Sequence, residues 1–246
     1  MSAALAGLTI LNPRLLAQAG AWTKALQAQG AEVIELPLLA LRPRVLVQAE
    51  KSKLLDLDRY HACIFVSANA ARCGIEAVAD YWPQWPYGVT VFAVGQATAM
   101  PLQEAALNVL LPASADSEGL LAMPELQAEQ ISGKRVLLFR GSQGRELLTQ
   151  GLTQRGATVD VLALYDVVLP STANAQWQAL SRAPDVVLLT SPMVWQHWQQ
   201  VAGASAVLPT LVVSSVRLAE IVRAAGAQDV RIVHGASLSD WLAALL

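Results

Sequence analysis

The chain has 246 residues, of which 54% are hydrophobic and 15% are charged, and its formal net charge is −2. This composition excludes a disordered chain, which would be hydrophilic and strongly charged, and a general nucleic-acid binder, which would show a basic excess. The two cysteines, Cys63 and Cys73, are too few for a disulfide-stabilised scaffold, and we interpret them as buried thiols.

Short apolar runs alternate with helical patterns along the chain. Runs that lack polar alternation and are rich in leucine and β-branched residues are typical of parallel strands buried on both faces. Ten such runs are predicted as strands, at residues 8–11, 33–36, 63–67, 89–94, 109–111, 136–140, 159–164, 186–190, 210–214 and 230–233.

Helical patterns lie between these runs, and glycines end three of them. The first apolar stripe runs from Leu15 to Leu26 and stops at Gly30; the others, over 147–152 and 216–222, stop at Gly156 and Gly226. Strands that alternate with helices predict an α/β fold with parallel sheets and right-handed crossovers.

The second half of the chain repeats the first. Residues 8–36 and 134–162 both read as strand, helix, Gly-Ala-x-Val and strand, and Arg140 falls opposite Arg14. The two following strands repeat as well, which places Ser214 opposite Gly95. We therefore expect two similar α/β domains, and a simple boundary between them would fall in the polar stretch 127–133.

The apolar composition requires a test for membrane segments. The longest stretch without Asp, Glu, Lys or Arg, residues 186–216, is interrupted by prolines, glutamines and a histidine. It therefore contains no run of ~18 apolar residues. The first residues carry no basic segment, which argues against a signal peptide, and we expect a cytoplasmic protein.

Small and polar residues follow the predicted strands at residues 12–14, 67–69, 95–98, 140–145, 190–192 and 214–215. Ligands of open α/β sheets bind at the carboxyl ends of the strands, and helix N-termini there bind anions. The segment from Arg140 to Glu146 is the strongest signal, because it combines glycines with arginines, which donate to carboxylates or phosphates. Each turn alone is also typical of an ordinary helix cap; their repetition favours a ligand site.

Common catalytic and cofactor motifs are absent from the sequence. It contains no P-loop, no Gly-x-Gly-x-x-Gly, no His-Glu-x-x-His, no Cys-x-x-Cys and no Gly-x-Ser-x-Gly. Tyr165 follows the strand predicted over 159–164, where a tyrosine either packs in the core or donates a proton. Both interpretations stay open from the residues alone.

Taken in order, these segments resemble the uroporphyrinogen-III synthases over nearly the whole chain. The residues that carry the resemblance are 65–70, 93–95 with Thr98, 133–141, 144–147, 155–157, Tyr165, 190–192 and 213–214. The resemblance implies two parallel-sheet α/β domains joined by a two-stranded β linker. One domain would comprise residues 1–36 and 168–246 and the other residues 40–164, with linker strands over 36–41 and 162–169.

The resemblance also implies a reaction. Members of this family are lyases that close the linear tetrapyrrole hydroxymethylbilane to uroporphyrinogen III, with inversion of the last pyrrole ring and loss of water, and they need no metal or organic cofactor. Tyr165 is the matching candidate for the proton donor to the leaving hydroxyl. The candidates for binding the substrate and its many carboxylates are Arg14, Ser67, Ala68, Asn69, Gly95, Thr98, Arg140, Gly141, Arg145, Ser191, Pro192 and Ser214.

Two other functions are compatible with the residues. One is a non-catalytic two-domain protein that binds an anionic small molecule, which the repeat and the scarcity of acid–base residues favour. The other is a nucleotide-sugar transferase, for which the chain is short and lacks an acidic metal-binding pair. We expect a monomer that has a small-molecule partner and no nucleic-acid or membrane partner.

Overall fold

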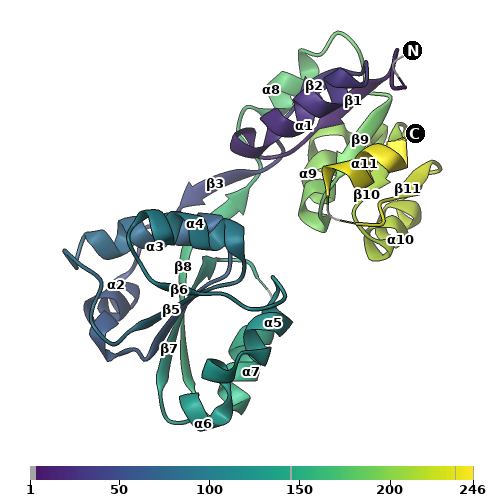
Figure 1. Cartoon of the computed structure of the whole chain (residues 1–246). Helices are drawn as coiled ribbons and strands as arrows, with labels where there is room; N and C mark the ends of the chain where they lie inside the picture. Colours follow the sequence, from purple (N-terminus) through teal and green to yellow (C-terminus); the bar gives the residue numbers. More distant parts are fainter. Residues whose placement is uncertain (1–3, 145, 236, 246) are drawn as a thin grey trace. The chain divides into compact units, whose positions relative to one another are not determined.

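The computed structural model describes residues 4–144, 146–235 and 237–245 (Figure 1). The chain forms two compact units, the first made of residues 1–40 and 168–246 and the second of residues 41–167. The simple boundary at 127–133 is wrong, because this segment lies inside the second unit, whose sheet continues on both sides of it.

The first unit is a parallel sheet in the order β11-β10-β9-β1-β2. Its strands are β1 (Thr9–Asn12), β2 (Glu32–Glu35), β9 (Val186–Leu189), β10 (Thr210–Val213) and β11 (Val230–Ile232). Its helices are α1 (Leu16–Ala28), α8 (Ala173–Gln178), α9 (Pro192–Ala202), the 3-10 helix η3 (Gly203–Val207), α10 (Val216–Ala224) and α11 (Leu238–Leu245).

The second unit has a sheet in the order β3-β8-β7-β4-β5-β6, in which β8, β7, β4, β5 and β6 pair in parallel. Its strands are β3 (Ala40–Pro43), β4 (Ala62–Phe65), β5 (Thr90–Ala93), β6 (Val109–Leu110), β7 (Arg135–Gly141) and β8 (Thr158–Val168). Its helices are α2 (Gln48–Leu55), η1 (Leu57–Arg59), α3 (Ala68–Ala79), α4 (Gln96–Glu104), α5 (Ser117–Ala122), η2 (Pro124–Leu126), α6 (Ala128–Ile131) and α7 (Leu147–Gln154).

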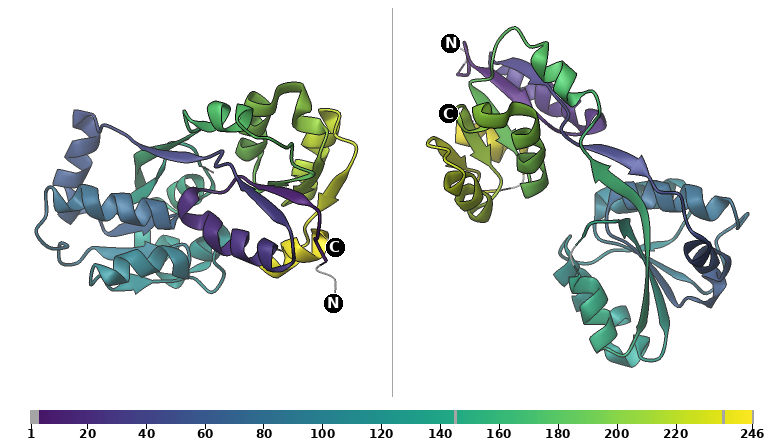
Figure 2. Two further views of the ribbon diagram at one scale, coloured as in Figure 1. Left: turned by 90° about the horizontal axis from the view of Figure 1, so that it is seen from above. Right: turned by 180° about the vertical axis from the view of Figure 1, so that it is seen from behind.

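Helices cover both faces of each sheet (Figure 2). Successive strand residues point to opposite faces, so each apolar strand contributes to two cores. In β9, Leu188 packs on the side of Trp22 and Trp241, whereas Val187 and Leu189 pack on the opposite side. This double burial explains why the strands read as uninterrupted apolar runs, and the predicted fold class is confirmed.

The internal repeat is confirmed by strand register. Thr9 pairs with Glu32 between β1 and β2, and Arg135 pairs with Thr158 at the same offset between β7 and β8. The spatial order β2-β1-β9-β10-β11 matches β8-β7-β4-β5-β6, so the second unit is a circular permutation of the first. The order reverses beside β1 and β9 in one unit and beside β7 and β4 in the other, where such sheets bind ligands.

One part of the predicted repeat is wrong by one residue. The strands β5 and β10 start at Thr90 and Thr210, so the position that matches Gly95 is Ser215 and not Ser214. Gly95 and Ser215 are also the N-cap residues of α4 and α10.

The glycines predicted to end helices do so with left-handed backbone. Gly30, Gly156 and Gly226 have φ angles of 90°, 85° and 104°, a region that L side chains rarely adopt. The predicted linker over 36–41 and 162–169 stays a prediction. In the structure β3 and β8 are neighbours in the second sheet, and the boundary between the units falls within β3 and at the end of β8.

Other sequence expectations concern thiols and membranes. Both cysteines are free; Cys63 is buried as expected, but the interpretation as a buried thiol is wrong for Cys73, which is partly exposed. Within the described residues, no helix combines the length and apolarity needed to span a bilayer.

Candidate functional site

The candidate site of the second unit lies at the carboxyl edge of its sheet, where β7 and β4 meet. The turns after β4, β5 and β7 all open at this edge, because these strands are parallel. Ser67 follows β4, Gly95 follows β5, and Gly141 ends β7. The sheet order thus gathers predicted site residues that are far apart in the sequence.

Tyr165 reaches this edge from β8. Its hydroxyl lies 2.9 Å from the Ser67 Oγ, although β7 separates their two strands in the sheet. The tyrosine is only 6% exposed and packs in the core that contains Phe65 and Phe139. The structure therefore confirms the interpretation that Tyr165 packs in the core, and it places the hydroxyl at the carboxyl edge. Proton donation by Tyr165 stays a prediction.

Gly141 allows the Tyr165 ring to lie across β7, because glycine has no side chain. A Cβ atom at Gly141 would lie 2.8 Å from the ring carbon Cε2 of Tyr165, which is closer than real contacts allow. A glycine is therefore needed at position 141 because the Tyr165 ring packs closely there, and not because of the backbone conformation.

The surroundings of Tyr165 keep its phenol protonated. Burial raises the pKa of Tyr165 above its ordinary value, and this effect outweighs the hydrogen bond with Ser67, which lowers the pKa. At neutral pH the phenol therefore carries its proton.

Predicted binding residues near Tyr165 occupy helix starts. Ser67 caps α3 by accepting the Ala70 N–H at 3.0 Å, and Ala68 and Asn69 form the first turn of that helix. Gly95 caps α4 without a side chain, and Thr98 is buried in the first turn, 4% exposed. These helix starts present backbone N–H groups with a partial positive charge to the carboxyl edge.

Replacement of Ser67 by alanine is expected to raise the pKa of Tyr165 further and to lower the free energy of unfolding by about 1 kcal/mol. The variant removes both the cap of α3 and the hydroxyl that lowers this pKa. Ser191→Ala is the matched control, because Ser191 caps α9 by accepting the Val194 N–H. NMR titration of the tyrosines should show a changed Tyr165 pKa in Ser67→Ala and not in Ser191→Ala. An unchanged Tyr165 pKa in Ser67→Ala would mean that the Ser67 and Tyr165 hydroxyls are not hydrogen bonded in solution.

Arg140 lies at the end of β7 with a side chain that is 12% exposed. Its guanidinium forms an ion pair of 2.7 Å with Glu146, whose side chain is 52% exposed. The helix predicted over 147–152 is α7, which begins at Leu147 with Glu146 as its N-cap, so it does not start directly after Arg140. The predicted binding residue Arg145 lies outside the described residues.

The first unit has a corresponding edge where β1 and β9 meet. Ser191 caps α9, and Pro192 occupies the first helical position, where a missing N–H costs nothing. In the turn predicted over 214–215, Ser215 caps α10 by accepting the Leu218 N–H, whereas the Ser214 hydroxyl donates to the Thr190 carbonyl at 3.0 Å. Ser214 thereby ties the turn after β10 to the turn after β9.

Arg14 packs along an aromatic ring of the same unit. Its guanidinium carbon lies 4.4 Å from the ring centre of Trp22, a cation–π contact. Partial burial lowers the pKa of Arg14, although an arginine stays charged at neutral pH. Asn12, which precedes it, donates to the Ala19 carbonyl and Thr23 hydroxyl and so ties β1 to α1.

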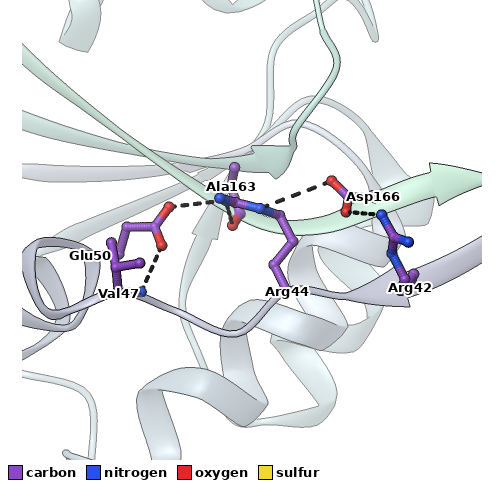
Figure 3. A network of polar contacts seen from close by, with 6 residues as sticks. All are labelled: Arg42, Arg44, Val47, Glu50, Ala163 and Asp166. Carbon is purple, nitrogen blue, oxygen red and sulfur yellow. Dashed lines mark hydrogen bonds and ion pairs between the residues drawn. The ribbon is translucent and has the colours of Figure 1, made fainter.

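An ion-pair network beside Tyr165 could not be predicted from the sequence. Arg42 lies 2.9 Å and Arg44 3.9 Å from the carboxylate of Asp166, and Arg44 also pairs with Glu50 at 2.9 Å (Figure 3). The sequence offers no signal for it, because Arg42 and Asp166 are 124 residues apart and meet only when β3 lies beside β8.

Comparison with known proteins gives a consistent result. The family described as "Uroporphyrinogen-III synthase HemD" matches residues 20–243. The chain is 31% identical over 229 residues to uroporphyrinogen-III synthase of Salmonella typhimurium, an alignment that spans 86% of this chain and 84% of that protein. It is 31% identical over 231 residues to uroporphyrinogen-III synthase of Escherichia coli K12, across 89% of this chain and 92% of that protein.

Solved structures agree at the level of the fold. The chain aligns with uroporphyrinogen-III synthetase of Helicobacter pylori 26695 at a TM-score of 0.63 and 16% identity, over 96% of both chains. It aligns with a mutant uroporphyrinogen III synthase of Thermus thermophilus at a TM-score of 0.62 and 16% identity, over 97% of both chains.

Proposed function

The chain belongs to the uroporphyrinogen-III synthase family of cyclising enzymes in tetrapyrrole biosynthesis, and we propose that the carboxyl edge of its second unit carries the chemistry. The observation that carries this proposal is the buried, protonated Tyr165, hydrogen bonded to Ser67 where β7 and β4 meet. The family membership does not favour a binding protein without catalytic activity.

Tyr165 is the proton donor of the first step in this proposal. The terminal hydroxyl of hydroxymethylbilane takes the phenol proton and leaves as water, so the C–O bond breaks and a cationic azafulvene forms. The last pyrrole ring attacks this cation, a spiro intermediate rearranges, and the proton released when the pyrrole becomes aromatic again returns to the phenolate. Because the raised pKa makes the phenol a weak acid, the geometry in which the substrate is held supplies much of the rate.

Helix starts and Arg140 bind the carboxylates of the substrate in this proposal. The helix N-termini proposed to bind carboxylates are those of α3 and α4 in the second unit and those of α9 and α10 in the first. Backbone N–H groups at such positions bind anions without a basic surface. The scheme therefore suits a chain with a net charge of −2.

Arg140→Gln is expected to raise KM for hydroxymethylbilane roughly 10-fold at low salt, since a hydrogen bond to a charged group contributes about 1.5–3 kcal/mol. The difference from the wild-type chain should shrink between ~0.1 M and ~1 M salt, where the screening length falls from ~10 Å to ~3 Å. Glu146→Gln should lower KM, because it removes the carboxylate that competes for Arg140.

Arg59→Gln is the control for general charge effects. Arg59 pairs with Asp56 and precedes β4, at the opposite edge of the sheet from Arg140. Steady-state kinetics at several salt concentrations provide the measurement. A KM that is unchanged at low salt in both the Arg140 and Glu146 variants would contradict a role of this ion pair in binding.

We also propose a cytoplasmic monomer without a nucleic-acid partner. The two free thiols suit a reducing compartment, and the weakly acidic charge balance does not favour nucleic acid. Sedimentation equilibrium of the purified chain tests the oligomeric state, and a dimer mass would contradict the proposal.

The reaction itself is tested by the isomer of the product. Hydroxymethylbilane closes to the I isomer without help, so formation of uroporphyrinogen III by the purified chain requires the catalysed inversion of the last ring. Chromatographic separation of the oxidised products distinguishes the two isomers.

A further inference from the structure

A bulge in β8 lies directly before Tyr165. Arg140 of β7 pairs with Ala163 of β8, but the next residue, Gly141, pairs with Tyr165, so Leu164 is an extra residue in β8. Bulges redirect side chains and are frequent beside active sites. The direction of the Tyr165 side chain therefore depends on this irregularity.

The bulge turns two successive carbonyl groups to the same side of β8. In a regular strand, successive carbonyls alternate between the two neighbouring strands. Here the Tyr165 carbonyl accepts the Ser142 N–H at 2.8 Å on the β7 side, whereas the carbonyls of Ala163 and Leu164 both accept hydrogen bonds from Arg44.

Arg44 satisfies the two carbonyls with two different groups. Its backbone N–H donates to the Leu164 carbonyl at 2.9 Å, and its guanidinium Nη1 donates to the Ala163 carbonyl at 2.6 Å. The second carbonyl of the bulge thus depends on a side-chain donor.

Acidic residues on two elements hold the guanidinium in place (Figure 3). Glu50, in the first turn of α2, is 2.9 Å from Nη1, and Asp166 is 3.9 Å from Nε. Burial acts to raise the pKa of Glu50, but the hydrogen bonds from the Val47 N–H and from Arg44 bring this pKa below its ordinary value. Glu50 therefore stays ionised, and its carboxylate and that of Asp166 hold the Arg44 guanidinium.

We propose that Arg44 is a positioning residue for Tyr165: its guanidinium stabilises the bulge at Ala163, and the bulge directs the Tyr165 hydroxyl to Ser67. The consequence for catalysis rests on the proposed role of Tyr165 as proton donor. Arg44 acts through the strand and not on the reacting atoms.

Arg44→Gln tests this proposal, because it removes the guanidinium and keeps the backbone hydrogen bond to Leu164. We expect kcat to fall roughly 10-fold with little change in KM, since a misplacement of ~1 Å can cost up to about 100-fold in rate. The same substitution should have little effect on kcat when Tyr165 is already phenylalanine, because no hydroxyl remains to be misplaced.

The placement of Tyr165 is measured separately by NMR of the chain labelled with ¹³C at the tyrosine Cζ. The chain has four tyrosines, and Tyr165→Phe assigns the signal of interest. Arg44→Gln should move the Tyr165 resonance. The matched control is Arg42→Gln, which removes the neighbouring ion pair with Asp166 but leaves both bulge carbonyls bonded to Arg44, and it should leave the resonance in place.

The outcomes distinguish the two proposals. A Tyr165 resonance that does not move in folded Arg44→Gln overturns the positioning role. If Arg44→Gln does not fold, Arg44→Lys is used instead. Lysine lacks the planar guanidinium, so we expect a smaller displacement of the Tyr165 resonance. A Tyr165 resonance that does not move in Arg44→Lys also overturns the positioning role. If Tyr165→Phe retains full turnover, the catalytic role of Tyr165 fails, while a displaced resonance still supports Arg44 as the residue that sets its position.

Discussion

Replacement of Tyr165 by phenylalanine is expected to lower kcat roughly 100-fold, near the lower end of what a positioned proton donor contributes. The phenylalanine ring fills the same space in the core around Phe65 and Phe139, so the second unit should stay folded. KM should change little, because the carboxylates of the substrate are bound elsewhere in this account. Steady-state kinetics and thermal unfolding of the variant provide the two measurements.

Tyr60→Phe is a matched control for the loss of a buried phenol. Tyr60 is 2% exposed and donates to Asp160 at 2.9 Å, but it precedes β4 and lies at the opposite edge of the sheet. We expect Tyr60→Phe to cost about 1 kcal/mol of stability with no effect on turnover. Equal turnover of the Tyr165→Phe variant and the wild-type chain would remove Tyr165 from the mechanism.

Gly141→Ala is expected to reduce kcat by a similar factor, about 100-fold, because displacement of a catalytic group by ~1 Å is enough for such a loss. The new methyl group would lie 2.8 Å from the Tyr165 ring, so the ring must move and its hydrogen bond with Ser67 breaks. Overpacking should also lower the free energy of unfolding by about 1–3 kcal/mol.

Gly20→Ala provides the comparison for a harmless added methyl group. Gly20 lies in α1, and a Cβ atom there meets nothing within 4 Å. This variant should gain up to about 1 kcal/mol of stability from helix propensity and keep full turnover. A Gly141→Ala variant with wild-type kcat would show that the ring does not need to cross β7 for catalysis.

Strands buried on both faces could be predicted from sequence, because both faces need apolar residues and the strand then reads as an uninterrupted apolar run. Val186–Leu189 is apolar throughout and lies in the centre of its sheet. By contrast β3 is an edge strand that contains Arg42 and Pro43 and is half exposed, so no apolar run marks it. The residues alone give no sign of this strand, and only the family resemblance placed a strand near it.

The candidate site could be predicted in part. Parallel strands bring their carboxyl ends to one edge, which explains why Ser67 and Gly95 could be found from their turns. The crossing of Tyr165 over Gly141 depends on the sheet order β8-β7-β4, which no local pattern encodes. The N-cap of α10 could not be predicted to the residue, because either of the adjacent serines Ser214 and Ser215 suits a helix cap until the strand register is known.

The isomer of the cyclised product distinguishes catalysis by this chain from spontaneous ring closure. Freshly prepared hydroxymethylbilane is given to the purified chain, to the same chain after heat denaturation and to buffer alone, and the oxidised porphyrins are separated by chromatography. We predict that the native chain yields mainly the III isomer, whereas the two controls yield the I isomer. Formation of the I isomer alone in all three samples would contradict this prediction.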